Sequence, residues 1–345
     1  MNTFNKKIIY GVITTIFLIG GIVSFNFYQK IYGKSITKSG AIYIKSEDTF
    51  DDVKKQLTSY MDNPENFIWV ADKKRFTKPK GGKYLLKKGM SLNDVVNLLR
   101  NGNQTPIKLS FNNQDSLEKL AGRIATQIET DSISLVKVMR DVSFLTKNEF
   151  NQKNALGMYI PNSYEFYWNT SAEKFRNKML TEYNRFWNSS RLNKAKKLNL
   201  SKKEVSTLAS IVQKETAQKS ERPIVAGLYL NRLKNNWPLQ ADPTVIYCIK
   251  QLKGDDFVVK RVLTKDLEIE SPYNTYRNSG LPPSLIAMPD VSAIDAVLNY
   301  KKHGYYYMCA SIEKIGFHDF ATSLAQHNRN AVKYQQWISK RGINR

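Results

Sequence analysis

Hydrophobic residues are unevenly distributed along the chain, and the first informative pattern lies at its start. Residues 8–27, IIYGVITTIFLIGGIVSFNF, include no charged side chain. A helix rises about 1.5 Å per residue, so a stretch of this length crosses a hydrocarbon layer of about 30 Å. The pattern predicts a transmembrane anchor within residues 1–28. A cleaved signal peptide is the alternative, although the run is long for one and SFNFYQK lacks a small-x-small cleavage site.

The orientation of this anchor depends on the lysines that flank it. Lys6 and Lys7 precede the apolar run and favour a cytoplasmic N-terminus, because basic residues remain on the cytoplasmic side of a membrane. The lysines that follow the run favour the opposite orientation; they are Lys30, Lys34 and Lys38. We expect a single-pass protein of the cell (inner) membrane with its N-terminus inside and its main domain outside the cytoplasm.

A polar linker, 29–40, leads into a small α+β module over 41–111. AIYIK, GKYLL and PIKLSF have the composition of short strands. TFDDVKKQL at 49–57 and SLNDVVNLL at 91–99 predict two helices, and Ser46 or Thr49 is the candidate cap of the first. The two helices share a pattern of hydroxyl, Asp, Val and Leu, which DSLEKLAGRIA at 115–125 repeats faintly. Internal repetition and chance similarity of capped amphipathic helices both remain open.

The remainder, 112–345, is predicted to be a larger, mostly helical domain with short strands, which makes the fold class α+β. Residues 126–200 indicate helices with polar connections. Within them, KNALGMYIPNSYEFYWN at 153–169 is expected to be a loop, because it contains glycine, proline and asparagine. Its many aromatic residues suit either core packing or contact with a sugar ring.

The helix that begins at Ser201 contains the most informative residue. Ser201 and Glu204 have the spacing of a capping box. With about 100° between successive residues, Glu215 falls within the apolar stripe while Lys214 falls on the opposite face. Burial of a carboxyl group raises its pKa, which suits a proton donor near neutral pH. The structural alternative is that Glu215 turns outward or pairs with an arginine, such as Arg222 or Arg232.

Further elements are predicted after this helix. Ser220 is a candidate cap for a second helix with Pro223 in its first turn. Asp242 is a candidate N-cap, with Pro243 at the first position of a third helix. SPYNTYRNSGLPPSLIAMP at 271–289 is a long irregular segment, which indicates function or disorder, and Tyr273, Asn274 and Tyr276 disfavour disorder. YYYMCAS predicts a strand, and FHDFATSLAQHNRNAVKYQQW a turn that leads into a closing helix.

Composition narrows the classes of partner. The 345 residues include 53 basic and 30 acidic side chains, a formal net charge of +23. Such an excess favours an anionic partner, which can be nucleic acid, a lipid surface or an acidic polymer.

The two cysteines, Cys248 and Cys309, are too few for a disulfide framework, and the sequence does not decide whether they form a single disulfide. The three histidines have no metal-ligand spacing and no phosphate-binding motif occurs, so we expect neither a metal nor a cofactor.

Five motifs taken together resemble a known family. ASIVQKET, SERPIVAGLYLNRL, LQADPTVIY, SPYNTYRNSGLPPSLIAMP and HDFATSLAQHN occur in this order, as they do in the endolytic murein transglycosylases of bacteria, the YceG-like family. The likeness covers roughly 40–340 and is strongest over 205–330. It implies a LysM-like fold for the small module and a catalytic role for the larger domain.

The resemblance implies an enzyme that cuts peptidoglycan glycan strands at the β-1,4 bond from N-acetylmuramic acid to N-acetylglucosamine. No water is added, because the muramic C6 hydroxyl attacks its own C1 and leaves a 1,6-anhydro end. The glutamate of the KET motif, Glu215, is the implied acid. The implied sugar-binding residues are Gln240, Asp242, Thr244, Tyr247, Ser271, Tyr273, Asn274, Thr275, Tyr276, His327 and Asn328.

The implied partners are peptidoglycan, inner-membrane lipids and peptidoglycan synthases, since the family's role is to end nascent strands. The anchor and the absence of a recognition motif argue against nucleic acid. A membrane-anchored adaptor without catalysis is the alternative. The sequence also departs from the family at Leu156, Asn162 and Gln213, where acidic residues are common. We expect these changes to alter sugar affinity or the pKa of Glu215 rather than abolish activity.

Overall fold

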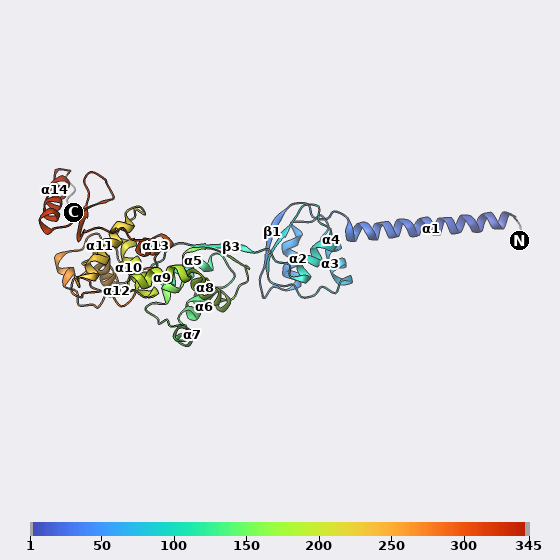
Figure 1. Ribbon diagram of the computed structural model, residues 1–345. Coiled ribbons are helices and arrows are strands. Elements are labelled where there is room, and N and C mark those ends of the chain that lie inside the picture. Colours follow the sequence, from blue (N-terminus) through green and yellow to red (C-terminus); the bar gives the residue numbers. More distant parts are fainter. Residues whose placement is uncertain (1–2, 342–345) are drawn as a thin grey trace. The chain divides into compact units, whose positions relative to one another are not determined.

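The computed structural model describes residues 3–341, and the chain divides into two compact units (Figure 1). The smaller unit contains the chain as far as Leu109, together with 127–130 and 164–171. The larger unit contains the rest. The two short returns of the chain into the smaller unit are not apparent in the sequence pattern. The fold is α+β, mostly helical with short strands, as predicted.

The apolar N-terminal run forms one long helix, α1 (Thr3–Tyr32). Of the helices that the structure describes, only α1 is long and apolar enough to cross a membrane, over Lys7–Tyr32. The apolar side chains from Ile8 onward are exposed, as a lipid-facing helix requires. The helix extends past Phe27 into the segment expected to be linker, and Ile36 further along is buried in the core of the smaller unit.

The smaller unit is built on the antiparallel pair β1 (Gly40–Ile44) and β2 (Gly82–Leu86), in which Ile42 lies opposite Tyr84. Three helices accompany this pair: α2 (Phe50–Thr58), α3 (Pro64–Lys73) and α4 (Leu92–Asn101). Both α2 and α4 begin with a complete capping box, and the cap of α2 is Thr49, one of its two candidates. The apolar faces meet in one core, which includes Ile44, Val53, Phe67, Tyr84 and Leu99.

The segment 153–169 is not a loop throughout, contrary to the sequence prediction. It contains the short helix η1 (Ala155–Met158) and the strand β4 (Asn162–Phe166), which pairs with β3 (Ile107–Phe111). Its aromatic and apolar residues divide between the interior and the surface: Tyr159 is buried, whereas Tyr167 is exposed. The partner strand lies about fifty residues earlier in the chain, so local turn signals could not reveal the pairing.

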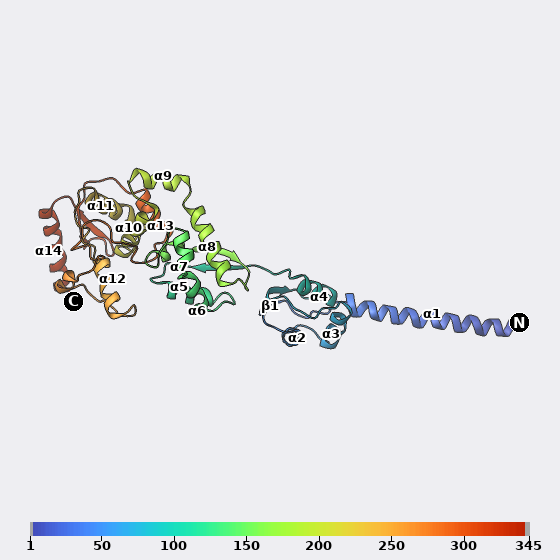
Figure 2. The same ribbon diagram turned by 90° about the horizontal axis from the view of Figure 1, so that it is seen from below.

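The larger unit is predominantly helical (Figure 2). Its helices are α5 (Leu117–Ala125), α6 (Ser132–Met139), α7 (Val142–Lys147), α8 (Ala172–Phe186), α9 (Ser189–Lys197), α10 (Lys202–Glu215), α11 (Arg222–Lys234), α12 (Asp242–Lys253), η2 (Thr264–Glu268), α13 (Val291–Leu298) and α14 (Leu324–Lys340). The central element is α10, which packs against α9, α11, α12 and α13. Every residue from Val205 to Gln213 is buried.

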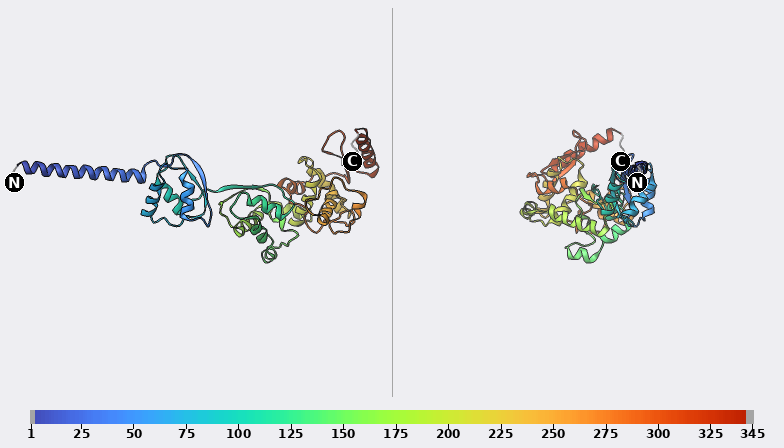
Figure 3. Two further views of the ribbon diagram at one scale, coloured as in Figure 1. Left: turned by 180° about the vertical axis from the view of Figure 1, so that it is seen from behind. Right: turned by 90° about the vertical axis from the view of Figure 1, so that its right-hand side faces the viewer.

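Two features near the C-terminus complete the frame of this unit. The segment 271–289 is irregular, as predicted, but its side chains are extensively hydrogen-bonded, so it is not a disordered stretch. His318–Ala321 forms a strand, β6, rather than the predicted turn, and pairs antiparallel with β5 (Tyr307–Ala310). Helix α14, dark red in Figure 3, packs against this hairpin.

Candidate active site

A cavity of about 420 Å³ lies in the larger unit, at the end of α10. Several elements that are distant in sequence contribute to its wall: α10, α11, the start of α12, the irregular segment, β5, β6 and α14. The charged and titratable residues in that wall are Glu215, Tyr229, Arg232, Asp242, Tyr276, Tyr307, Cys309, His318 and His327. The long-range packing of the fold therefore gathers many of the polar residues that the sequence motifs contain.

Glu215 is the last residue of α10, and the fold directs it inward as its helical position predicts. The capping box of Ser201 and Glu204 fixes the start of the helix, and Lys214 points outward to form an ion pair of 2.7 Å with Asp115. The Glu215 side chain is partly buried and accepts a hydrogen bond of 2.5 Å at Oε1 from the hydroxyl of Tyr229. Its Oε2 has no hydrogen-bond partner among the residues that the structure describes.

Burial raises the pKa of Glu215 to about 7. The hydrogen bond from Tyr229 and the positive charges of His318 and Arg232 oppose this rise, while the carboxylate of Asp242 adds to it. Burial is the dominant cause, so Glu215 is the kind of carboxyl group that holds a proton near neutral pH and can donate it.

Neither candidate arginine forms an ion pair with Glu215. Arg222 instead contacts Asp290 at 2.8 Å, and both side chains are largely buried. Arg232 donates to the backbone carbonyls of Leu239 (2.6 Å) and Tyr306 (2.8 Å), although its charge remains close enough to influence Glu215. The structural alternative from the sequence is therefore wrong, because backbone oxygens and Asp290 already occupy the two guanidinium groups.

Asp242 does not cap α12, contrary to the sequence prediction. The N-cap position belongs to Ala241 and makes no side-chain hydrogen bond, and Asp242 is the first residue of the helix. Its Oδ1 accepts a hydrogen bond of 2.6 Å from the hydroxyl of Tyr276, and both side chains line the cavity. Ser220 is likewise not a cap, since the N-cap of α11 is Glu221.

The structure separates the eleven predicted sugar-binding residues into groups. Four of them line the cavity with Glu215: Gln240, Asp242, Tyr276 and His327. Another group is buried or bonded within the irregular segment and the start of α12 and does not line the cavity: Thr244, Ser271, Tyr273, Asn274 and Thr275. Tyr247 lines a second cavity of about 560 Å³, and Asn328 is exposed on α14.

The buried group has a clear structural role. The hydroxyls of Thr244 and Thr275 are 2.9 Å apart, and Thr275 also accepts a hydrogen bond from the backbone N–H of Ala241. Asn274 donates to two backbone carbonyls near η2, and the Tyr273 hydroxyl contacts Ser284 at 2.7 Å. These bonds fix the irregular segment against α12 and so place Tyr276 beside Asp242.

The geometry can be compared with known proteins. The sequence model of the YceG-like family matches residues 42–333. The chain belongs to this family. A Bacillus subtilis protein named endolytic murein transglycosylase is 32% identical over 269 residues, which are 73% of this chain and 72% of that protein. Relatives of the same name in two strains of Streptococcus pneumoniae are 27% identical over 295 residues. The match covers 78% of this chain but only 53% of the length of those relatives.

A solved structure agrees with this assignment. A crystal structure of a YceG-like protein from Listeria monocytogenes matches with a TM-score of 0.57 and 27% sequence identity. The match covers 85% of this chain and 98% of that one, so the similarity extends over both units rather than over one motif. The α+β fold described above is therefore shared with a solved member of the YceG-like family.

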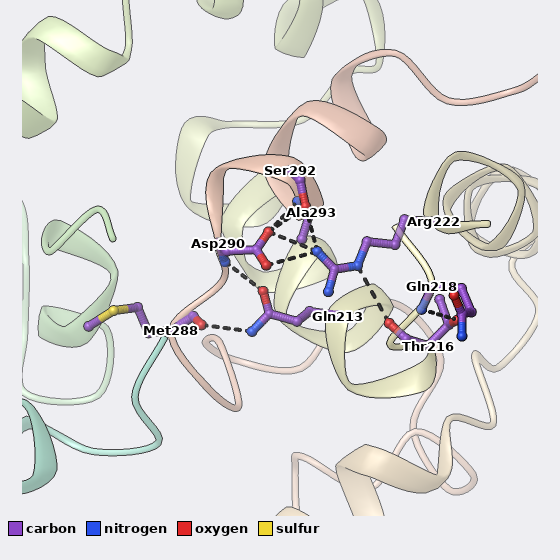
Figure 4. A network of polar contacts seen from close by, with 8 residues as sticks. All are labelled: Gln213, Thr216, Gln218, Arg222, Met288, Asp290, Ser292 and Ala293. Carbon is purple, nitrogen blue, oxygen red and sulfur yellow. Dashed lines mark hydrogen bonds and ion pairs between the residues drawn. The ribbon is translucent and has the colours of Figure 1, made fainter. Parts of the chain in front are cut away.

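The three departures from the common YceG-like pattern lie outside the Glu215 cavity. Leu156 lines the second cavity, and Asn162 is exposed at the start of β4. Gln213 is buried, and its amide donates to the carbonyl of Met288 (3.1 Å) and accepts from the N–H of Asp290 (2.6 Å) (Figure 4). Gln213 thus ties α10 to the end of the irregular segment, and the expected effect on the pKa of Glu215 remains a prediction.

The cavity of this YceG-like protein also contains residues that the sequence analysis did not select. Tyr229 contacts Glu215 directly, and His318 lines the same wall. Both lie within motifs that carry the family resemblance, SERPIVAGLYLNRL and HDFATSLAQHN. Tyr229 is fourteen residues beyond Glu215 on the next helix, a spacing without a local pattern. Motif membership was therefore the one available signal for these two residues.

Proposed function

We propose that this chain is an endolytic murein transglycosylase, which cuts the glycan strands of peptidoglycan internally. The observation that carries the proposal is the position of Glu215, a partly buried carboxyl group with a pKa of about 7 in the wall of a cavity. It occurs in a member of the YceG-like family whose relatives bear this name.

The reaction requires one carboxyl group in two successive roles. Because the Tyr229 hydroxyl donates to Oε1, the proton of neutral Glu215 belongs on Oε2. Glu215 gives this proton to the glycosidic oxygen as the bond from C1 of N-acetylmuramic acid breaks. The resulting carboxylate then removes the proton from the muramic C6 hydroxyl as its oxygen bonds to C1. No water is consumed, and the attached nucleophile supplies the effective concentration.

Within the cavity, we assign contact with sugar to Gln240, Asp242, Tyr276 and His327. The buried residues of the irregular segment position these side chains rather than contact the substrate. Asp242 is a second carboxylate in the same wall, and glycosidases that add water commonly use two carboxyl groups. Hydrolysis by Glu215 and Asp242 is therefore the competing reaction. Hydrolysis leaves hydrated glycan ends, whereas the transglycosylase reaction leaves 1,6-anhydro ends.

The surroundings of this site follow from the rest of the chain. We assign α1 to the cell membrane with its N-terminus in the cytoplasm, which places the larger unit outside the cytoplasm with its substrate. In the smaller unit, the antiparallel pair of β1 and β2 with helices α2, α3 and α4 supports a LysM-like assignment. The net charge of +23 suits anionic lipid headgroups and the anionic wall. Peptidoglycan synthases are the expected protein partners, because the proposed cut ends nascent strands.

The experiment is digestion of purified peptidoglycan by the full-length protein in mild detergent, with products read by mass spectrometry. The variants are Glu215→Gln and, as a control, Glu313→Gln, which replaces an exposed glutamate of the same unit. We expect ends that are one water lighter than hydrolytic ends from the wild type and the control, and none from Glu215→Gln. Hydrated ends that disappear in Asp242→Asn would establish the hydrolase instead.

Two further outcomes bear on the proposal. If the folded wild type binds peptidoglycan without cutting it, the adaptor interpretation replaces the enzyme. Orientation is tested separately by adding a protease to intact protoplasts. Degradation of the larger unit is expected for a domain outside the cytoplasm, and its protection would reverse the assigned topology.

A further inference from the structure

His318 and Glu221 form a pair, and His318 lines the same cavity as Glu215. Glu221 is only 3% exposed, and its Oε1 accepts the backbone N–H of His318 at 2.7 Å. Its Oε2 lies 2.9 Å from Nδ1 of the His318 ring. Glu221 stands at the N-cap position of α11 but makes no cap hydrogen bond with its side chain. Its carboxylate instead holds the first residue of β6, 97 residues later in the chain.

The contact fixes the protonation pattern of the ring. A carboxylate only accepts hydrogen bonds, so Nδ1 of His318 carries a proton and Nε2 is the atom that gains or loses the second one. Nε2 has no hydrogen-bond partner among the residues that the structure describes. Burial is the largest cause and lowers the pKa of His318, but the hydrogen bond and charge of Glu221 together with the charges of Glu215 and Asp319 outweigh it, so this pKa is raised.

We propose that His318, held as an imidazolium ion by Glu221, is a positioning residue that stabilises the carboxylate form of Glu215. The inference rests on the proposed function, because it concerns how one carboxyl group serves first as acid and then as base. Burial favours neutral Glu215, which suits the first role and disfavours the second. A fixed cation in the same wall lowers the free energy of the carboxylate that must exist between the two proton transfers.

His318 is distinguished from the other groups that face Glu215. The pKa of Glu215 is also influenced by Tyr229 and Arg232 on α11 and by Asp242 on α12. Arg232 keeps its charge at any working pH, and Asp242 acts in the opposite direction. Of the cations that lower the pKa of Glu215, His318 is the one whose charge can change near neutral pH; His327 lines the same wall but is not among the causes that shift Glu215. The groups that favour its charged form are Glu221, Glu215 and Asp319.

The first test does not require activity. Electrostatic coupling is reciprocal, so the charge of Glu215 must raise the pKa of His318 as much as His318 lowers that of Glu215. The chain has three histidines, which makes an NMR titration of the full-length protein in detergent tractable. We expect the pKa of His318 to be lower in Glu215→Gln than in the wild type. Glu313→Gln, which replaces an exposed glutamate of the same unit, is the control and should leave the pKa of His318 unchanged.

The second test measures kcat/KM on peptidoglycan fragments against pH. The basic limb reports loss of the proton from Glu215 in the free enzyme. Both His318→Gln and Glu221→Gln should move this limb to higher pH, because the first removes the imidazole and the second removes the carboxylate that favours its charged form. Lys214→Gln is the matched control: it deletes a positive charge one residue from Glu215, but that charge pairs with Asp115 outside the cavity. Its basic limb should not move.

The outcomes separate the inference from the function on which it rests. If the wild type does not form anhydro ends, the proposed function fails while the NMR titration still tests the coupling. An unchanged pKa of His318 in Glu215→Gln would overturn the inference. So would variants of His318 and Glu221 that lower the rate at every pH without moving the basic limb, since that result indicates a purely structural role.

Discussion

The raised pKa of Glu215 carries a cost in stability that can be measured. The folded protein holds this proton up to a pKa of about 7, whereas the unfolded chain releases it at the ordinary value of 4.5. A raised carboxyl pKa leaves the free energy of unfolding unchanged below the pKa of the unfolded chain. Between the two pKa values the free energy of unfolding falls as the pH rises, and above the pKa of the folded protein the loss is complete. Replacing Glu215 with glutamine removes this loss, because the amide does not ionise.

The magnitude follows from the two pKa values. Each difference of one in pKa corresponds to about 1.4 kcal/mol. Integration of the protons bound between pH 5 and pH 8 gives a loss of roughly 2.5 kcal/mol in the free energy of unfolding of the wild type. Water that enters the cavity screens the carboxylate and reduces this figure. We expect Glu215→Gln to be more stable than the wild type at pH 8 and similar to it at pH 5.

The assay is pulse proteolysis of the full-length protein in detergent over a series of urea concentrations. Peptides from the larger unit, identified by mass spectrometry, report its unfolding separately from that of the smaller unit. Glu313→Gln removes an exposed glutamate from the same unit and should follow the wild type at both pH values. If the wild type and Glu215→Gln lose stability in parallel from pH 5 to pH 8, Glu215 is not held protonated by burial and the reasoning is refuted.

Three further predictions concern the neighbours of Glu215. Tyr229→Phe should move the basic limb of the kcat/KM–pH profile up by about one to two pH units, because a hydrogen bond to a charged group contributes ~1.5–3 kcal/mol. An unchanged limb would contradict the 2.5 Å hydrogen bond between Tyr229 and Glu215. Asp242→Asn should move that limb to lower pH, since the charge of Asp242 raises the pKa of Glu215. It should leave the free energy of unfolding within about 0.5 kcal/mol of the wild type, since Asp242 is not a cap. Thr275→Val should destabilise the larger unit by roughly 1–3 kcal/mol, because the buried Thr244 hydroxyl and Ala241 N–H lose a partner; proteolysis midpoints equal to those of the wild type would count against it.

Local patterns were sufficient for the elements that depend on local physics. The uncharged run predicted α1, a candidate hydroxyl cap indicated the start of α2, and the spacing of Ser201 and Glu204 predicted the start of α10. Helical periodicity also predicted that Glu215 points inward and Lys214 outward. Each of these features depends on residues that are close together in the chain, so a single stretch of sequence contains the necessary information.

Features that depend on distant partners were not accessible in the same way. Asp242 has the ideal sequence context of an N-cap, yet a hydroxyl 34 residues later takes its carboxylate. Strand β6 resembled a turn because its partner, β5, and the carboxylate of Glu221 are contributed by other segments. The family motifs indicated which segments form the site, but they did not separate residues that face the cavity from residues that hold those segments in place.

The buried amide of Gln213 has a consequence for how the site responds to acid and base. It must donate to one backbone group and accept from another at the same time, and both atoms are occupied. A glutamate in this place could make the same two bonds only while it carries a proton, and on losing that proton it would face the carbonyl of Met288 with a negative charge. Glutamine supplies the same donor as a covalently bound N–H that no change of pH removes. The hydrogen bonds between α10 and the end of the irregular segment therefore do not depend on pH. Glu215 can ionise while the helix that positions it stays bound to that segment.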